Sequence, residues 1–376
     1  MTFKIAINGA VLNAQRHGIS RYTKQLLRHL SKIDTGEIEF CVFADEKQGF
    51  ADIERLIDTS RTHNRVIWDT IRFCQRAEAV GADAIHSPDK GPFLKGNLPL
   101  VSTIHDLLPY FHSDERKFPN GTYWQLSLRR QAALSDAIIT VSESTKQDVI
   151  ERFGVSSNKV HVTPLGTDLS RPSKQEVREV QNEYGISATS FNVLYVGNYN
   201  DRKNVDRVVE ACKEISKHIE EINLFLAGGD PSVETLQKKA GCFRGSITFL
   251  GYVPDEHLEG LYGAADLFVY PSSYEGFGLP VLEAMACGTP VITSDTSSLP
   301  EVTGDAAITI DPESTSELST AIRSVYDDKE LRESMKIDGL NRAEQMTWER
   351  TAQETLSVYN RLLTGKETSD MPPRKI

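Results

Sequence analysis

The sequence predicts an α/β protein built from two doubly wound domains, each with a parallel sheet. Short β-branched stretches such as FKIAING alternate with longer amphipathic stretches such as RYTKQLLRHLSKI at 21–33. This alternation is typical of parallel sheets that are covered by helices on both faces. It starts again after residue 190, where FNVLYVG precedes VDRVVEACKEI. The chain of 376 residues is long enough for each series to form its own hydrophobic core.

The domain boundary is predicted near 168–190, where the chain is rich in proline, glycine and polar residues. We therefore expect one domain over 1–170 and a second over 171–346. Apolar residues at helical spacing predict a last helix over 347–363. The polar end of the chain, 364–376, is expected to be disordered.

The formal net charge of −11 is unevenly distributed along the chain. Residues 1–170 hold 21 Lys+Arg against 20 Asp+Glu, whereas residues 171–376 hold 21 against 33. The overall acidity argues against a general nucleic-acid-binding protein. The nearly neutral first part is compatible with contact to an anionic membrane surface or an anionic partner, and an acidic surplus that only aids solubility is the alternative.

Cysteine use and hydropathy indicate a cytoplasmic protein. The five cysteines are scattered and lack metal-ligand spacing, which favours reduced thiols over a disulfide framework or a zinc site. No early stretch resembles a secretion signal, and no run approaches the roughly 18 apolar residues of a membrane span. Peripheral contact with the inner face of a membrane stays open, because aromatic and basic residues lie close together in one stretch, with an ordinary charged helix as the alternative. These residues are Arg116, Lys117, Tyr123, Trp124, Arg129 and Arg130.

The stretch SSYEGFGLPVLEAMACGTPVI combines acids, glycines and a predicted helix start. Pro280 suits the first turn of a helix, so the helix is expected to begin within two residues of Gly278. The free N–H groups and the positive dipole end of such a helix attract anions. Glu275 and Glu283 could accept hydrogen bonds from vicinal hydroxyls, which suits a polyhydroxylated ligand. The alternative is a helix cap beside a core-facing turn, with Glu275 as a solvated charge.

A second group of candidates lies in the stretch VGNYNDRKNVDRVVEAC. Gly197 ends a predicted strand, and Arg202 and Lys203 lie in the loop that precedes the next helix. This loop follows a strand of the same sheet as the first stretch, so the two cations could reach the same ligand and offset the charge of a departing diphosphate. The P-loop spacing GxxxxGK[ST] is absent. Two solvated loop charges are the alternative.

The first half of the chain offers weaker candidates. Gly18 opens a predicted helix and could present backbone amides to a phosphate. His105 and Asp106 end an apolar strand, where a histidine is more often packed or hydrogen-bonded than catalytic. No D-x-D motif follows a strand, so no metal site is predicted, and cationic side chains and helix termini would have to stabilise a leaving group instead. No G-x-S-x-G or Cys/His arrangement indicates a hydrolase.

Taken together, these motifs resemble the retaining glycosyltransferases of family 4, or glycosyltransferase group 1. YEGFGLPVLEAMACGTPVI resembles the E-x7-E signature of that family, GNYNDRKN its donor-phosphate loop and TWERTA its closing tryptophan motif. PLGTDL and AIITVSESTKQDV are also similar to family motifs, so the resemblance covers nearly the whole chain. It implies the GT-B fold, with two facing Rossmann-like domains and a cleft between them. Residues 1–170 would be the acceptor side and 171–346 the nucleotide-sugar donor side, and the helix over 347–363 would pack back toward the first domain.

The resemblance implies a role for each matching residue. Glu275 would contact the hydroxyls of the donor sugar near the reacting centre, and Glu283 would bind the nucleotide ribose. Arg202 and Lys203 would hold the diphosphate, and His105 would lie beside the donor sugar. The remaining donor-binding positions act through their backbone or small size and are Gly18, Gly197, Phe277, Gly278 and Leu279.

The implied reaction moves a hexose from a nucleotide diphosphate sugar to an acceptor hydroxyl with retention of the anomeric configuration, and needs neither a metal nor a cofactor. GISRYTKQLL with IHDLLP looks most like bacterial mannosyltransferases of polysaccharide and O-antigen assembly. GDP-mannose is therefore the first choice of donor, and a glycan or lipid-linked glycan is the expected acceptor. Family members often have two glycines in the first loop, whereas His17 precedes Gly18 here. This difference leaves the function of the acceptor-side loop unassigned.

Other activities remain alternatives. The donor could be a UDP- or dTDP-sugar. The chain could also be a GT-B sugar-nucleotide epimerase, a synthase that uses a sugar phosphate as acceptor, or a non-catalytic partner that binds nucleotide sugars.

Overall fold

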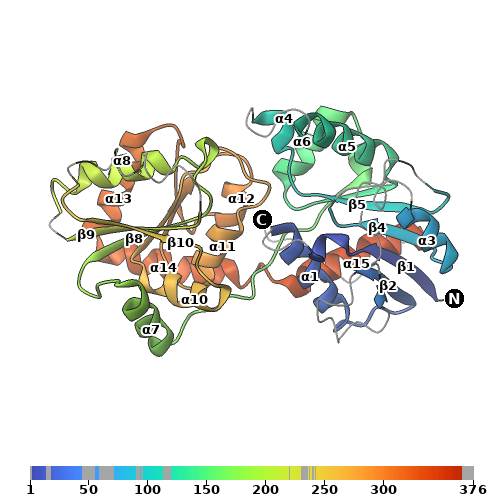
Figure 1. The fold of residues 1–376 in the computed structure, drawn as a ribbon, viewed down its shortest axis with the longest axis horizontal. Helices are drawn as coiled ribbons and strands as arrows, with labels where there is room; N and C mark the ends of the chain where they lie inside the picture. Colours follow the sequence, from blue (N-terminus) through green and yellow to red (C-terminus); the bar gives the residue numbers. More distant parts are fainter. Residues whose placement is uncertain are drawn as a thin grey trace. The chain divides into compact units, whose positions relative to one another are not determined.

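The protein is described by a computed structural model (Figure 1). The description covers residues 2–13, 18–44, 56–58, 72–89, 94, 96–112, 120–219, 221–229, 236, 238, 241 and 243–365.

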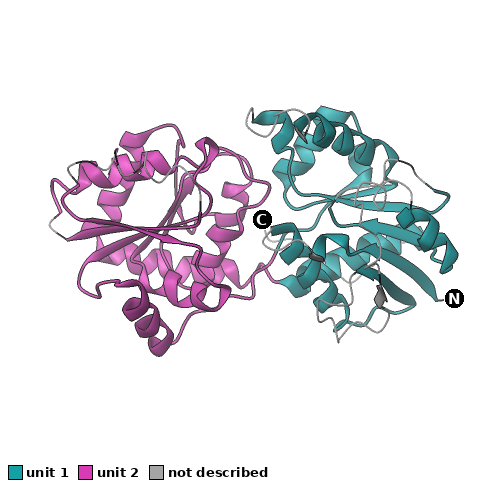
Figure 2. Ribbon diagram, in the orientation of Figure 1, with its two compact units in different colours: residues 1–165, 348–376 teal, residues 166–347 magenta. Residues whose placement is uncertain are grey.

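The chain forms two compact units (Figure 2). Unit 1 comprises Met1–Leu165 together with Trp348–Ile376, and unit 2 comprises Gly166–Thr347. The chain therefore leaves unit 1 once, forms the whole of unit 2 and returns to unit 1 for its last helix. The predicted disordered tail lies, from residue 366 onward, outside the described residues.

Unit 1 is built on a seven-stranded sheet with the strand order β3-β2-β1-β4-β5-β6-β7. All of its strand pairs are parallel. The strands are β1 (Phe3–Asn8), β2 (Ile38–Ala44), β3 (Leu56–Asp58), β4 (Ala84–Ser87), β5 (Leu100–Ile104), β6 (Ala137–Thr140) and β7 (Val160–Val162). The helices are η1 (Ala10–Asn13), α1 (Gly18–Leu30), α3 (Phe73–Ala79), α4 (Leu108–Phe111), α5 (Asn120–Leu134), α6 (Glu143–Phe153), η5 (Ser157–Lys159) and α15 (Trp348–Thr364).

Unit 2 is built on a six-stranded parallel sheet with the order β10-β9-β8-β11-β12-β13. The strands are β8 (Phe191–Val196), β9 (Ile222–Ala227), β10 (Ser246–Gly251), β11 (Leu267–Tyr270), β12 (Val291–Ser294) and β13 (Ile308–Ile310). The helices are α7 (Lys174–Tyr184), η6 (Asp201–Lys203), α8 (Val205–Ile215), α10 (Asp255–Ala264), α11 (Leu279–Ala286), α12 (Leu299–Thr303), α13 (Thr315–Asp327) and α14 (Lys329–Ala343).

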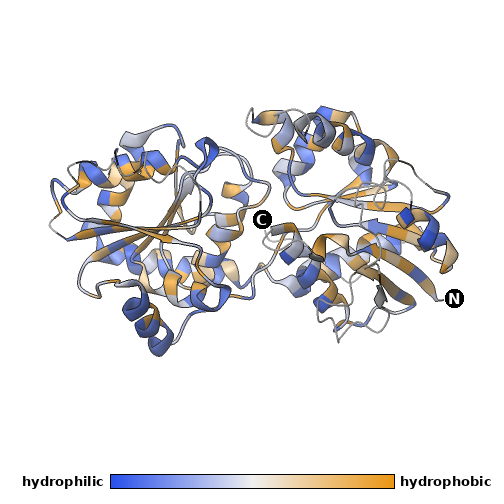
Figure 3. Ribbon diagram, in the orientation of Figure 1, coloured by the Kyte–Doolittle hydropathy of each residue, from blue (hydrophilic) through white to orange (hydrophobic). Residues whose placement is uncertain are grey.

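The predicted α/β architecture with two doubly wound parallel sheets is confirmed. The strands are apolar along most of their length (Figure 3), and central residues such as Val193, Leu224 and Phe268 are fully buried. This burial on both faces explains why the strands appear in the sequence as nearly continuous apolar stretches. The three-residue strand β3 was not predicted, because so short a stretch carries no readable periodicity.

The last helix, α15, belongs to unit 1 through buried contacts. Tyr359 is fully buried, and its hydroxyl forms a hydrogen bond of 2.6 Å with Nδ1 of His86 on β4. Trp348, at the start of α15, is 1% exposed, and its ring centroid lies 6.4 Å from that of Tyr22 on α1. The apolar spacing that predicted this helix therefore corresponds to a face that completes the core of unit 1.

Each sheet reverses its strand order at one point, between β1 and β4 in unit 1 and between β8 and β11 in unit 2. Ligands of doubly wound sheets bind beyond the carboxyl ends of the strands at such a point. In unit 2 the chain continues from these strand ends into the loops that contain Arg202, Lys203 and Glu275.

Candidate active site

The loop after β8 brings its two cations to the switch point of unit 2. Asn200 caps η6 by accepting a hydrogen bond from the backbone N–H of Lys203, at 3.2 Å. Asn204 then takes a left-handed conformation, with φ of 51°, and its side-chain amide donates to the carbonyl of Pro271 at 2.9 Å. The N–H of Ser273 donates to the carbonyl of Arg202, also at 2.9 Å. The loops after β8 and β11 are therefore fixed to each other through their backbones.

A close approach of two backbones shapes the start of the same loop. Gly197 follows β8 and Gly228 follows β9. A Cβ atom on Gly228 would lie 2.0 Å from the carbonyl oxygen of Gly197, and Gly228 has φ of +129°. Only glycine permits this packing, so these strand ends present bare backbone at the edge where a ligand would bind.

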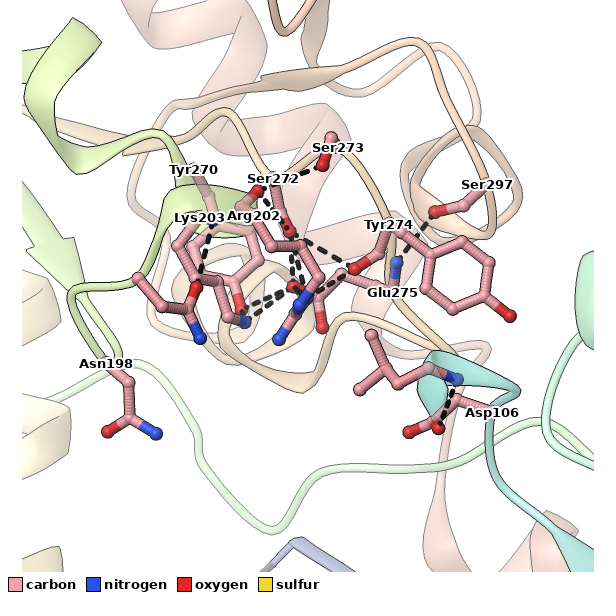
Figure 4. Close-up of polar contacts among 12 residues, drawn as sticks. Asp106, Asn198, Arg202, Lys203, Tyr270, Ser272, Ser273, Tyr274, Glu275 and Ser297 are labelled. Carbon is pink, nitrogen blue, oxygen red and sulfur yellow. Dashed lines mark hydrogen bonds and ion pairs between the residues drawn. The ribbon is translucent and has the colours of Figure 1, made fainter. Parts of the chain in front are cut away.

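The Glu275 carboxylate is the centre of a buried polar cluster (Figure 4). Its Oε1 accepts hydrogen bonds from Arg202 Nη1 at 2.6 Å, from Lys203 Nζ at 2.5 Å and from the Ser272 hydroxyl at 2.6 Å. The Tyr270 hydroxyl lies 3.2 Å from the same oxygen and also contacts Lys203. The side chains of Arg202, Lys203 and Glu275 are 12%, 9% and 13% exposed, respectively. The structure thus brings together three of the four residues predicted to be catalytic.

The charges of this cluster determine its protonation. Burial raises the pKa of the Glu275 carboxyl, but Lys203 and Arg202 outweigh burial and lower this pKa from 4.5 to about 2. Burial, followed by the Glu275 charge, raises the pKa of Tyr270 well above 10, so its hydroxyl keeps its proton. Two cations and one carboxylate leave a formal charge of +1 in a setting with little water. Such a site attracts an anion more strongly than the same charges would in water.

The turn after Glu275 leads directly into a helix. Gly278 has φ of 110° and precedes α11, and a Cβ atom there would lie 2.6 Å from Cδ2 of Leu299. Phe277 is buried. Leu279 begins α11, so the helix starts within two residues of Gly278, as the sequence predicts.

Pro280 has no N–H, and the N–H groups of Val281 and Leu282 donate to the carbonyl of Gly278. The start of α11 therefore contributes mainly its positive dipole end at the switch point where the cations lie, and this dipole end favours a negative charge.

Glu283 lies one helical turn further along α11 and is only 4% exposed. Its Oε2 accepts a hydrogen bond of 3.0 Å from the hydroxyl of Tyr262 on α10. Burial, followed by the Glu283 charge, raises the pKa of Tyr262 well above 10, so Tyr262 remains a donor. The role of Glu283 toward a ribose stays a prediction.

The two candidates of unit 1 lie near its own switch point. His105 follows β5, and its Nε2 forms a hydrogen bond of 2.8 Å with the carbonyl of Pro88, just after β4. Its ring lies edge-on to Tyr22 of α1, with 4.8 Å between centroids, and burial lowers its pKa below 6.5. Gly18 begins α1 and is exposed. These contacts show a well-packed histidine, and its place beside a donor sugar stays a prediction.

Sequence reasoning missed several polar residues of the site. Tyr270 and Ser272 lie five and three residues before Glu275 and contact its carboxylate, so their closeness in the sequence could have indicated them. Ser297 accepts a hydrogen bond from the N–H of Glu275 at 2.9 Å, and Ser298 donates to the carbonyl of Glu275, also at 2.9 Å. These two serines follow β12, and no pattern in the sequence connects them with the turn.

Within the described part of the chain, no three His, Cys, Asp or Glu side chains are grouped so that they could hold a metal ion. In the same residues, no helix combines the length and the apolar composition that crossing a membrane requires. Of the predicted membrane-contact patch, Arg116 and Lys117 lie outside the described residues.

Comparison with known proteins gives consistent matches along the chain. The family model "Glycosyl transferases group 1" matches residues 176–342, and the model "Glycosyltransferase Family 4" matches residues 16–171. The O-antigen chain mannosyltransferase B of Escherichia coli is 35% identical over 272 residues, which are 70% of each chain. The serotype-specific mannosyltransferase WbdA of Escherichia coli is 26% identical over 282 residues, which are 72% of this chain and 34% of that protein.

Among solved structures, Anabaena Alr3699/HepE in complex with UDP-glucose matches with a TM-score of 0.73 and 18% identity, covering 96% of this chain and 99% of that one. The two doubly wound units have the GT-B fold. The chain belongs to the glycosyltransferases of group 1, family 4.

Proposed function

We propose that this protein is a retaining, metal-independent mannosyltransferase that transfers mannose from GDP-mannose to a hydroxyl of a glycan or lipid-linked glycan. The acceptor would belong to polysaccharide or O-antigen biosynthesis. The choice of sugar is supported by the 35% identity to the O-antigen chain mannosyltransferase B. The observation that carries the proposal is the buried cluster of Glu275 with Arg202 and Lys203 at the start of α11.

The cluster is suited to a diphosphate leaving group. As the bond between the sugar C1 and the phosphate oxygen breaks, negative charge develops on the diphosphate. Arg202 and Lys203 are held in place by the backbone of their loop, so they can stabilise this charge without first reorganising. The positive dipole end of α11 acts in the same direction. Together these groups would supply the stabilisation that a metal ion provides in other transferases.

Glu275 has a second task in this proposal. Its low pKa keeps it ionised, and an ionised carboxylate can accept hydrogen bonds from the hydroxyls of the donor sugar. The negative charge also favours a transition state in which the sugar C1 is partly cationic. The acceptor hydroxyl forms the new bond to C1, and its proton passes to the departing diphosphate.

A UDP-sugar donor is the second candidate, since Alr3699/HepE shares the fold and is known in complex with UDP-glucose. The intact cluster of Arg202, Lys203 and Glu275 weighs against a non-catalytic partner, because such proteins usually lose these side chains. A sugar-nucleotide epimerase would release a sugar-nucleotide isomer rather than a nucleoside diphosphate.

Proton NMR of the reaction mixture tests the proposal. With GDP-mannose and a mannose-terminated oligosaccharide, we expect GDP release and a new α-mannosyl signal, both unchanged by EDTA. Transfer from UDP-glucose only would contradict the choice of donor, a β-linked product would contradict retention, and loss of activity in EDTA would contradict metal independence. A sugar-nucleotide isomer without GDP would favour the epimerase.

A further inference from the structure

A short segment from the neighbouring strand holds the turn that carries Glu275. We call residues 296–299 the Ser297 loop. This loop follows β12, which pairs with β11, so it leaves the sheet next to the chain that contains Glu275. The Thr296 hydroxyl donates to the carbonyl of Ser273 at 3.2 Å. The N–H of Glu275 donates to Ser297 Oγ at 2.9 Å (Figure 4). The two segments thus run side by side.

The contact continues on the other side of Glu275. Ser298 is fully buried, and its hydroxyl lies 2.9 Å from the carbonyl oxygen of Glu275 and 2.7 Å from that of Phe277. The Leu299 side chain, also fully buried, occupies the space that a Cβ on Gly278 would need. The backbone of Glu275 is therefore held at both its N–H and its carbonyl by one loop.

The backbone of the Ser297 loop is strained at this place. Among the described residues other than glycine, only Asn204 and Ser297 have positive φ values, 51° and 53°. Asn204 adjoins Lys203 and Ser297 contacts Glu275. Asparagine tolerates this conformation well, whereas serine does not, and strained residues persist where the surroundings impose them, often at functional sites.

We propose that Ser297 and Ser298 are positioning residues that fix the backbone of Glu275, so that its carboxylate meets both the cations and the donor sugar. This inference rests on the proposed function, in which Glu275 contacts that sugar. Arg202 and Lys203 hold the carboxylate at its tip, whereas the Ser297 loop holds it at its backbone. Displacement of such a group by about 1 Å can lower a rate by roughly 10²-fold.

Substitutions at Ser297 separate positioning from stability. Ser297→Gly removes the hydroxyl that accepts from Glu275, and it also relieves the positive φ, because glycine adopts this conformation freely. We therefore expect a Tm within a few degrees of the wild type but at least a tenfold fall in kcat/KM for the donor. Ser297→Asn should retain most of the activity, because asparagine tolerates the same φ and offers a side-chain acceptor.

The two variants give a clear decision. If the loop has a structural role only, kcat/KM will fall only in a variant whose Tm also falls. Wild-type turnover in Ser297→Gly would overturn the proposal. Ser298→Ala should also lower kcat/KM, and Ser298→Thr should restore it. Asp305→Ala, an exposed change in the same unit, serves as the control with unaltered activity.

Amide hydrogen exchange tests the inference without any substrate. The N–H of Glu275 should exchange faster in Ser297→Gly than in the wild type, because its acceptor is removed. Unchanged exchange at Glu275 would overturn the inference even if the enzyme proves to be a mannosyltransferase. If exchange is faster in Ser297→Gly but the wild-type protein turns over none of the donors, the positioning of Glu275 by the Ser297 loop is supported and the proposed function is refuted.

Discussion

At the scale of single residues, the central feature is one carboxylate shared by two cations. Lys203→Ala removes the cation at 2.5 Å from Glu275 and leaves Arg202 as the other partner. We expect transferase activity to fall by about 10²–10³-fold, as when one preorganised donor is removed from a transition-state site. The measurement is the initial rate of nucleoside diphosphate release with saturating donor.

The matched control for this change is Lys217→Ala, an exposed lysine of the same unit, which should keep full activity. Thermal unfolding of both variants checks that they are folded. Near-wild-type turnover in Lys203→Ala would remove the basis for placing the diphosphate at this cluster.

The low pKa of Glu275 predicts an acid dependence of stability. The folded pKa of about 2 lies below the ordinary value of 4.5, so the stabilisation from the ionised carboxylate is complete above pH 4.5 and is lost as the pH falls toward 2. Glu275→Gln keeps the shape but cannot ionise. Urea unfolding from pH 6 to pH 3 should show the difference between wild type and variant shrinking with falling pH, and a constant difference would contradict the ion-pair account.

At the scale of elements, the turn from Glu275 into α11 depends on Gly278, whose positive φ and close approach to Leu299 disfavour any side chain. Gly278→Ala introduces a side chain at φ of 110° and places its Cβ 2.6 Å from Leu299. Gly185→Ala is a matched comparison, because Gly185 has φ of 66° but no atom within 4 Å of an added Cβ. The comparison variant should lose about 1–2 kcal/mol from left-handed strain alone.

We expect Gly278→Ala to lose more stability than Gly185→Ala and, in addition, to bind the donor more weakly, because the start of α11 must shift. Chemical unfolding and donor titration of both variants measure these effects. Equal losses of stability together with unchanged donor affinity would show that the turn has room to adapt.

The strand and helix pattern was readable because burial on both faces makes each strand a continuous apolar stretch. Arg202, Lys203 and Glu275 could be grouped from sequence because their loops follow strands of one sheet. The Ser297 loop could not be foreseen, since its contacts depend on β12 lying next to β11 and on a positive φ at a serine. The burial of Glu283 against Tyr262 could not be predicted from the sequence either, because it requires α10 to pack on α11.

At the scale of the whole molecule, the chain passes from unit 1 to unit 2 and back, and its last helix completes the core of unit 1. A protein that ends at residue 347 lacks Trp348 and Tyr359, which are 1% and 0% exposed. Losing even one buried aromatic side chain costs about 3–5 kcal/mol. We expect unit 1 of this truncated protein to lose its cooperative unfolding transition while unit 2 keeps its own.

Differential scanning calorimetry of the full and truncated chains measures this directly. A truncated protein with both transitions intact would contradict the assignment of α15 to the core of unit 1.

The central claim is that the cluster of Arg202, Lys203 and Glu275 binds the diphosphate of GDP-mannose. The most direct test is thermal unfolding of the wild type and of Lys203→Ala with GDP, GDP-mannose, UDP, UDP-glucose and dTDP. A ligand at 100 times its Kd stabilises the folded state by about 2.7 kcal/mol, which shifts Tm by several degrees. We predict a shift with GDP and GDP-mannose in the wild type and its loss in Lys203→Ala. Three outcomes would contradict the claim: a shift with uridine nucleotides only, the absence of a shift with every nucleotide, or a shift that persists in Lys203→Ala.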